Sequence, residues 1–130
     1  MNITINAKRV TSLTLTQDDE NEAVSDKKLH ISIGSEIFEN HNNRKLFRVR
    51  YPFNLVIKGV VTASLNYDFD FISDEDVSSD TLSSELVTIT APSLAFPYIK
   101  TYIENVLSSS GYAGISIPFL DFSLTPLNQR

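Results

Sequence analysis

The strongest constraint on the fold comes from two neighbouring segments in which apolar and polar residues alternate. Every odd position from 47 to 57 is apolar or aromatic, and so is every odd position from 61 to 71. Because successive side chains of a strand point to opposite faces, each segment predicts a strand with one apolar face. Lys58 and Gly59 lie between them, and this short connection predicts a hairpin. The apolar face of such a hairpin needs another element to cover it.

Two upstream segments predict the remaining strands. Residues 2–16 alternate loosely, and the irregular stretch at Lys8 and Arg9 predicts a bend or bulge there. Residues 29–33 alternate between aliphatic and polar side chains and predict a strand that runs on toward Phe38. Together with the hairpin, these segments predict a four-stranded antiparallel sheet.

Three stretches mark where the strands end or are disturbed. The acidic run at 17–26 has almost no apolar side chain and predicts a loop. The asparagine-rich stretch at 40–43 predicts a turn, because Asn tolerates left-handed backbone angles. Pro52 has no backbone N–H to donate to a neighbouring strand, so it predicts an edge position or a bulge.

The cover for the sheet is expected from the last third of the chain. Residues 79–90 predict a short helix, and residues 93–109 place their apolar side chains in one arc of a longer helix. Pro97 fits such a helix near its start or at a kink, and Gly111 ends it. A short helix or an extended tail is expected after it. The predicted fold class is α+β: a four-stranded antiparallel sheet covered by a long C-terminal helix and a shorter helix, in a single domain over residues 1–130.

Charge and composition exclude several classes of function. The formal net charge is −5, and the basic residues form no stripe that could neutralise nucleic-acid phosphates, so nucleic-acid binding is not expected. The chain has no cysteine, which excludes thiol chemistry and disulfides. The N-terminal MNITINAKRV lacks the apolar core of a signal peptide, and no stretch is apolar enough for membrane insertion. A cytoplasmic location is therefore expected.

No residue pattern predicts catalysis, a metal site or a cofactor. His30 falls on the polar face of a strand and His41 in the asparagine-rich turn, where solvated roles are expected. Asp68 and Asp70 share one outward face, which an ordinary solvated strand explains. The chain has neither a glycine-rich phosphate loop nor a nucleophile elbow, so we do not expect an enzyme.

The stretch LAFPYIKTYIENVLSSSGYAGISIPFLDF resembles the C-terminal signature of the SecB family of bacterial export chaperones. In that family an L-F-P-Y pattern starts the long helix, a glycine or turn ends it, and a short segment with proline and phenylalanine follows. The matching residues here are Leu94, Phe96, Pro97, Tyr98, Gly111, Pro118 and Phe122. The resemblance implies an α+β subunit that assembles as a homotetramer, a dimer of dimers. The predicted order of strands before helices agrees with it over most of the chain.

The resemblance also implies partners. SecB family members bind unfolded or precursor proteins, and an acidic sheet surface docks the SecA export motor. Asp68 and Asp70 lie on the corresponding kind of face and are the predicted partner-docking residues. Other SecB-like proteins are dedicated chaperones for one partner, notably the antitoxin of a toxin–antitoxin pair. The tail at 125–130 does not resemble the usual motor-binding end, and a divergent chain fits the dedicated role at least as well.

Two functional hypotheses follow. The first is an ATP-independent holdase that binds unfolded or partly folded polypeptides through apolar grooves, for protein export or for a dedicated partner such as an antitoxin. The second is a non-chaperone interaction protein with a SecB-like fold, for example a phage-encoded one, that binds one specific folded partner. Suppression of aggregation of several unrelated denatured proteins distinguishes the two.

Apolar residues outside the core arc of the helix indicate where partners bind, because exposed apolar patches rimmed by polar groups usually bind something. The predicted client-binding residues are Phe38, Tyr98, Tyr112, Ile117 and Phe119. The helix face opposite the core carries small polar side chains, which allow two helices to approach closely across a two-fold axis. The predicted oligomer interface on that face consists of Leu94, Tyr98, Thr101, Asn105 and Ser108.

Overall fold

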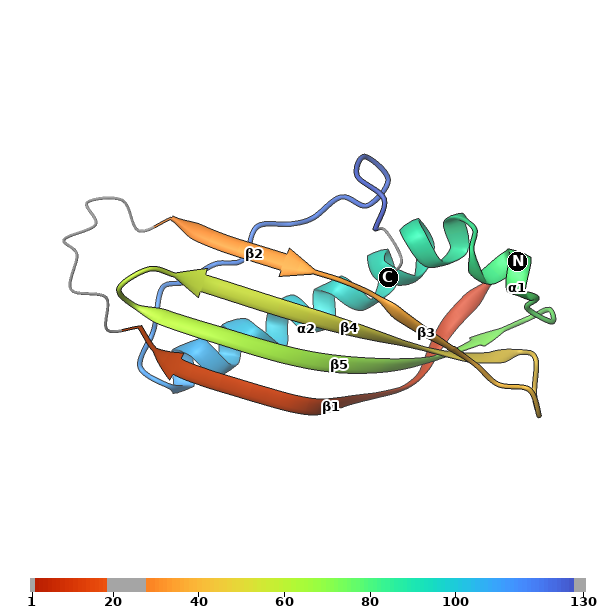
Figure 1. Cartoon of the computed structure of the whole chain (residues 1–130), viewed down its shortest axis with the longest axis horizontal. Helices are drawn as coiled ribbons and strands as arrows, with labels where there is room; N and C mark the ends of the chain where they lie inside the picture. Colours follow the sequence, from red (N-terminus) through yellow and green to blue (C-terminus); the bar gives the residue numbers. More distant parts are fainter. Residues whose placement is uncertain (1, 19–27, 128–130) are drawn as a thin grey trace.

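The structure is a computed structural model and describes residues 2–18 and 28–127. In these stretches an antiparallel sheet has the strand order β1-β5-β4-β2, with β3 also paired to β4, and a helical layer lies against one face (Figure 1). The elements are β1 (Ile3–Gln17), β2 (Leu29–Ile33), β3 (Glu36–Glu39), β4 (Leu46–Ile57), β5 (Val61–Ser73), α1 (Ser79–Leu82), η1 (Leu86–Thr90) and α2 (Ala91–Ser109). Most of the acidic run predicted as a loop at 17–26 lies outside the described residues, as does the end of the tail at 128–130.

The hairpin of β4 and β5 forms the centre of the sheet, as its alternating sequence predicts. The two strands pair without a register shift from the turn outward. The turn contains Gly59 with a φ of 76°, a backbone angle that glycine adopts without strain. Three aromatic side chains of the hairpin that the alternation predicts as core are buried, with 2%, 1% and 0% of their surface exposed: Phe47, Phe53 and Phe69.

β1 is an edge strand with two register shifts, one on each side of the irregular pair Lys8 and Arg9. The pairing with β5 shifts between residues 5 and 7 and again between residues 10 and 12. Each shift inserts one residue and thereby exchanges the face to which the following side chains point. The apolar residues that these exchanges place on the inner face are Ile3, Ile5, Val10, Leu13 and Leu15.

The predicted second strand is divided into β2 and β3, so the sheet has five strands where the sequence predicts four. Both strands pair with β4 in one continuous antiparallel register. Between them, the amide of Gly34 donates to the carbonyl of Pro52 at 2.9 Å, but Pro52 has no N–H to donate in return. Pro52 therefore lies in a central strand and not at an edge or bulge. The ladder is interrupted where its donor is missing.

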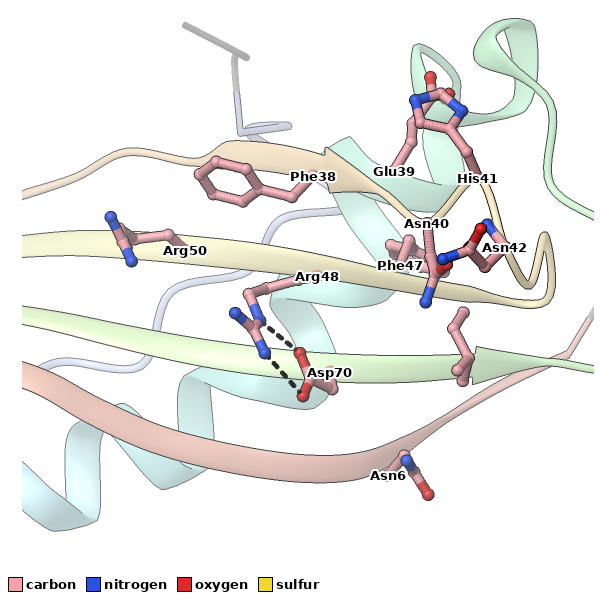
Figure 2. A pocket seen from close by; sticks show the side chains of 11 residues that line it. Asn6, Phe38, Glu39, Asn40, His41, Asn42, Phe47, Arg48, Arg50 and Asp70 are labelled. Carbon is pink, nitrogen blue, oxygen red and sulfur yellow. Dashed lines mark hydrogen bonds and ion pairs between the residues drawn. The ribbon is translucent and has the colours of Figure 1, made fainter.

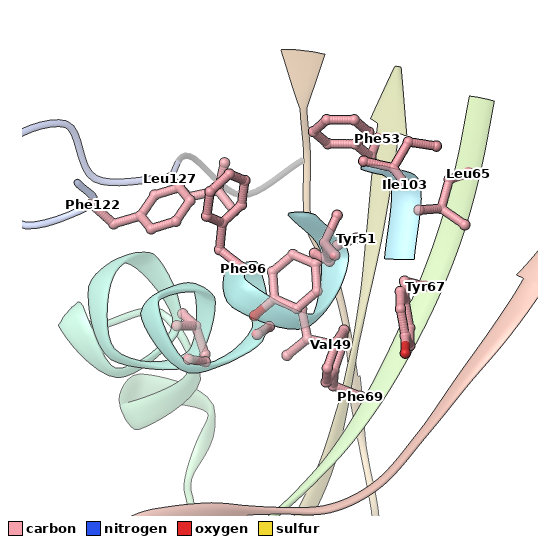
Figure 3. Close-up of a cluster of buried hydrophobic side chains, with 14 of the residues drawn as sticks. Val49, Tyr51, Phe53, Leu65, Tyr67, Phe69, Phe96, Ile103, Phe122 and Leu127 are labelled. Atoms are coloured by element: carbon pink, nitrogen blue, oxygen red, sulfur yellow. The ribbon is translucent and has the colours of Figure 1, made fainter. Parts of the chain in front are cut away.

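α2 covers the inner face of the sheet with one stripe of buried side chains (Figure 3). Within the predicted arc, the fully buried residues are Ala95, Phe96, Ile99, Ile103 and Leu107. Aromatic rings connect the two layers: Tyr102 lies 5.7 Å from Tyr67, and Tyr98 lies 6.2 Å from Phe69, measured between ring centroids. The predicted arc is thus the face that packs on the sheet.

The long helix begins earlier than its apolar periodicity predicts. η1, a single π-helical turn, leads directly into α2, while α1 is a separate short helix. The short helix predicted over 79–90 is therefore two elements. Pro92 occupies the first turn of α2, where a proline is tolerated, and Pro97 lies further inside the helix on its exposed side.

After α2 the chain reverses and returns along the helix on the β2 side of the molecule (Figure 1). Gly111 and Gly114 make the reversal possible with φ angles of 96° and 84°. Near the end of the chain, the amide of Leu127 donates to the carbonyl of Thr88 at 2.8 Å, beside the start of α2. This returning segment is irregular, and it completes the part of the core that α2 leaves uncovered.

Candidate functional site

The returning segment forms an arch over the β2 side of the core, which we call the C-terminal arch (residues 117–127). Ile117, Phe122 and Leu127 are its buried anchors, with 1%, 4% and 8% of their surface exposed. Between these anchors Phe119 and Leu124 point outward, with 72% and 81% exposed. Phe119 and Leu124 are therefore candidates for contact with a partner, because contiguous exposed apolar patches are the surfaces that usually bind one.

The arch and the end of β2 enclose a hollow of about 670 Å³. Ile33 and Gly34 form its wall on the sheet side. The apolar residues that the arch contributes are Phe119, Leu120, Phe122, Leu124, Pro126 and Leu127. Among the described residues of the lining, the single charged one is Asp121, and hydrogen bonds from Ser123 hold the pKa of its carboxyl below the ordinary value. The hollow is thus apolar, with one anionic group at its rim.

The middle of the arch is fixed by a turn around Asp121. A carboxylate oxygen of Asp121 accepts hydrogen bonds from the backbone amide of Ser123 at 3.0 Å and from its hydroxyl at 2.5 Å. The backbone carbonyl of Asp121 accepts from the amides of Leu124 and Thr125 at 3.2 and 3.1 Å. This turn separates Phe119 from Leu124 and points both outward.

Among residues 2–18 and 28–127, no strand pairs with the side of β2 that faces away from β4. Because the amide of Gly34 points to β4, the residues of β2 at odd positions direct their N–H and C=O groups away from β4. Leu29, Ile31 and Ile33 are these residues, and their side chains are half-buried on the inner face. An extended segment can add to this edge as a further strand, with alternate side chains directed toward the hollow.

A second surface runs along the exposed face of α2. The residues predicted as an oligomer interface recur at spacings of four and three, so they form one line along the helix, which we call the α2 stripe. All five are exposed: Leu94, Tyr98, Thr101, Asn105 and Ser108. Tyr98 keeps 46% of its surface exposed beside β1, and the Nζ atom of Lys8 lies 5.1 Å from its ring centroid. Tyr98 therefore places its part of the stripe beside β1.

The outer face of the sheet carries two cross-strand ion pairs, of which Figure 2 shows the one between Arg48 and Asp70. Arg48 donates to Asp70 at 2.6 and 3.2 Å, and Arg50 donates to Asp68 at 2.8 and 3.1 Å. The hydrogen bonds to these carboxylates raise the pKa of both guanidinium groups. The outward face predicted for Asp68 and Asp70 is confirmed, but Asp68 is buried, and each carboxylate faces an arginine. They form a neutral ladder and not a free acidic patch.

The predicted client-binding residues do not share one groove. Phe119 lines the hollow, and Tyr98 belongs to the α2 stripe. Phe38 lies on the outer face, where its ring contacts the guanidinium of Arg50 at 5.6 Å and borders a polar hollow of about 570 Å³ (Figure 2). Tyr112 is half-buried just after α2. Ile117 is in the core, because its side chain is an anchor of the arch, so it is not available to a partner in this conformation.

The structure adds residues that the sequence does not single out. In the sequence, Ile33 is predicted only as an apolar strand residue. Leu120 and Leu124 belong to a stretch without regular periodicity. Only the fold brings them beside Phe119. Their shared signal in the sequence is weak: apolar residues are dense on both sides of a turn-forming Asp121.

Within the described residues, no group of three or more His, Asp or Glu side chains could hold a metal ion. None of the helices over the same residues combines the length and apolar character needed to cross a membrane. His30 and His41 lie apart, one in β2 and one in the connection from β3 to β4.

Similarity to known proteins is found in sequence and in fold. No protein-family model matches the chain. Protein-export protein SecB of Ehrlichia chaffeensis is 26% identical over 122 residues, which cover 94% of this chain and 67% of that protein. The Mycobacterium tuberculosis Rv1957 SecB-like chaperone, solved in complex with a ChAD peptide from the Rv1956 HigA1 antitoxin, superposes with a TM-score of 0.74. That match covers 91% of this chain and 90% of the other. At 16% identity it shows that the two chains share a fold.

The chain resembles SecB in sequence and a SecB-like chaperone in fold. The resemblance predicted from the helix signature is confirmed in sequence and in fold, and the α+β class with an antiparallel sheet and a C-terminal helix is confirmed with it. The first of these relatives is named as a protein-export protein and the second as a chaperone.

Proposed function

We propose that this SecB-like chain is an ATP-independent holdase that binds unfolded or partly folded polypeptides at the C-terminal arch. The observation that carries the proposal is the pair Phe119 and Leu124, held in solvent above an apolar hollow and beside a free strand edge. An extended client adds backbone hydrogen bonds along β2, and its apolar side chains enter the hollow. Burial of these side chains contributes about 25 cal/mol per Å² of apolar surface, which slows aggregation without chemistry.

The proposed assembly is a homotetramer, a dimer of dimers, in which the α2 stripe packs against its copy. Thr101, Asn105 and Ser108 are small polar residues that let two helices approach closely, and Leu94 and Tyr98 add apolar area at one end. None of the stripe residues lines the hollow, so assembly through the stripe does not use the residues proposed to bind a client. Light scattering at micromolar concentration measures the mass, and a monomer contradicts this arrangement.

Besides unfolded clients in general, we propose that a dedicated partner offers a segment to the same site, and that the SecA export motor does not dock through Asp68 and Asp70. Both carboxylates are engaged by arginines, and a basic partner would have to break bidentate pairs to reach them. The Rv1957 chaperone is bound to an antitoxin peptide in its structure, which fits a role of this kind. The alternative is a non-chaperone interaction protein that binds one folded partner.

Suppression of aggregation tests the proposal. The chain is mixed at stoichiometric ratio with several unrelated denatured proteins, and light scattering is recorded as each is diluted from denaturant. We expect suppression of more than one of them, and its loss in the double variant Phe119→Ser/Leu124→Ser. Ile72→Ser is the matched control, because Ile72 is an exposed aliphatic residue (39%) on the outer face of the sheet.

The outcomes separate the hypotheses. If no unrelated protein is protected, the general holdase is wrong and a single-partner role remains. If the parent and the double variant protect equally, the activity exists but the arch is not its site.

A further inference from the structure

The two ends of the C-terminal arch are held in different ways. At its far end, the amide of Leu127 donates to the backbone carbonyl of Thr88. That carbonyl would receive the N–H of Pro92 in a regular helix, but proline has none to donate. The missing donor therefore leaves an acceptor for the arch. This hydrogen bond joins two backbone atoms, next to the buried side chain of Leu127.

The near end is held by one side chain. The amide of Ile117 donates to a carboxylate oxygen of Glu104 at 2.7 Å. Glu104 projects from the middle of α2, one turn after Lys100, whose Nζ atom donates to both oxygens of the same carboxylate at 2.9 and 2.8 Å. The carboxylate accepts a hydrogen bond from Ser116 as well, and these bonds, led by the one from Lys100, lower its pKa. A charged acceptor thus meets the segment where the arch begins.

The hydrogen bond between the Ile117 amide and Glu104 lies just before the exposed part of the arch. Ile117 is fully buried, so its amide needs an acceptor inside the protein. From Ile117 to the turn at Asp121 there are few residues, and Phe119 is among them. The direction in which Phe119 leaves the core is therefore set by the bond at Ile117 on one side and the turn on the other.

We propose that Glu104 is a positioning residue for client binding: by holding the Ile117 amide, it fixes the C-terminal arch in the conformation that opens the hollow beside β2. This inference rests on the proposed function, because it assigns the residue that shapes the same site. Glu104 itself lies outside the lining of the hollow.

The test compares three variants for binding to reduced and alkylated lysozyme as a permanently unfolded probe. Glu104→Ala removes the acceptor, and we expect about tenfold weaker binding, the loss typical of one charge-assisted hydrogen bond. Glu104→Gln keeps a carbonyl oxygen and is expected to restore part of the affinity. Lys100→Met is the matched control: it removes the ion pair but leaves the carboxylate for Ile117, so affinity should stay within about twofold.

Amide hydrogen exchange supplies the second readout. In Glu104→Ala the amide of Ile117 should exchange about tenfold faster, while the amide of Tyr112, which donates to the carbonyl of Leu107 at 2.8 Å, keeps its rate. Weaker binding together with faster exchange at Ile117 alone supports the proposal, and so does partial rescue by Glu104→Gln.

Several results overturn it. If affinity is unchanged while Ile117 exchanges faster, the arch does not need this bond to bind clients. If exchange at Ile117 is unchanged, Glu104 does not hold the arch. If Ile117, Tyr112 and the amides of β4 all exchange faster together, Glu104 has a general structural role. A parent chain that does not bind the probe overturns the proposed function, and the inference with it.

Discussion

The inner face of the sheet is covered by two elements that differ in kind, α2 and the C-terminal arch. α2 buries one regular stripe, and what remains exposed on it is mostly small and polar. The arch buries three anchors at intervals of five residues and leaves Phe119 and Leu124 in solvent. In a helix the period of 3.6 residues decides which side chains are buried, whereas in the arch each exposure is set separately by an anchor or a turn.

Because of this difference, we expect α2 to contribute mainly to stability and the arch mainly to binding. A helix that packs along its whole length contributes much to the core but offers a partner little apolar surface. An irregular segment contributes less to the core and can present apolar side chains at chosen places. We therefore expect substitutions under α2 to change stability, and substitutions on the arch to change binding.

The largest effect is expected from Phe69→Ala, under α2. Phe69 is completely buried and its ring stacks on Tyr67 at 4.6 Å, with Tyr98 of the helix at 6.2 Å. Loss of the ring leaves a cavity between two rigid layers, so the free energy of unfolding should fall by roughly 3–5 kcal/mol. Equilibrium denaturation in urea measures it. A loss near 1 kcal/mol would show that the contact between helix and sheet is looser than the structure describes.

A smaller effect is expected from Phe122→Ala, the central anchor of the arch. The ring of Phe122 lies 5.9 Å from that of Phe96 and is nearly as buried as Phe69. The arch has no helical backbone, so it can move into the space, and we expect a loss of about 2–3 kcal/mol in the same measurement. Client binding should weaken too, because the anchor positions Phe119 and Leu124. If the free energy of unfolding falls as much as in Phe69→Ala, the arch is packed as rigidly as α2 and the distinction between them is wrong.

Sequence patterns predict α2 and the sheet well because both have a period. The alternation at 47–57 and 61–71 locates the hairpin, and the helical arc identifies the buried face of α2. Two predictions are wrong for local reasons. The predicted second strand is divided into β2 and β3 opposite Pro52, and the long helix begins earlier than predicted because a π-helical turn leads into it.

The candidate site is harder to predict because it has no period. Ile117 and Phe119 are two residues apart in an irregular stretch, yet one is buried and the other exposed. The amide of Ile117 donates to Glu104, and a contact between residues thirteen apart leaves no pattern in the sequence. Ile33 is brought to the site by the pairing of β2 with β4, and that pairing cannot be predicted from a single sequence either.

The smallest effect on stability is expected from Phe119→Ser, which tests the arch directly. Since 72% of Phe119 is already in solvent, the free energy of unfolding should change by less than about 0.5 kcal/mol. Tyr112→Ser is the counterpart: Tyr112 is half-buried against the core, so we expect a loss of roughly 1 kcal/mol and little change in client binding. Thermal melts and binding to an unfolded probe are measured on both variants. If Phe119→Ser melts far below the parent, its ring belongs to the core. If Tyr112→Ser alone weakens binding, the client surface lies at the end of α2 and not on the arch.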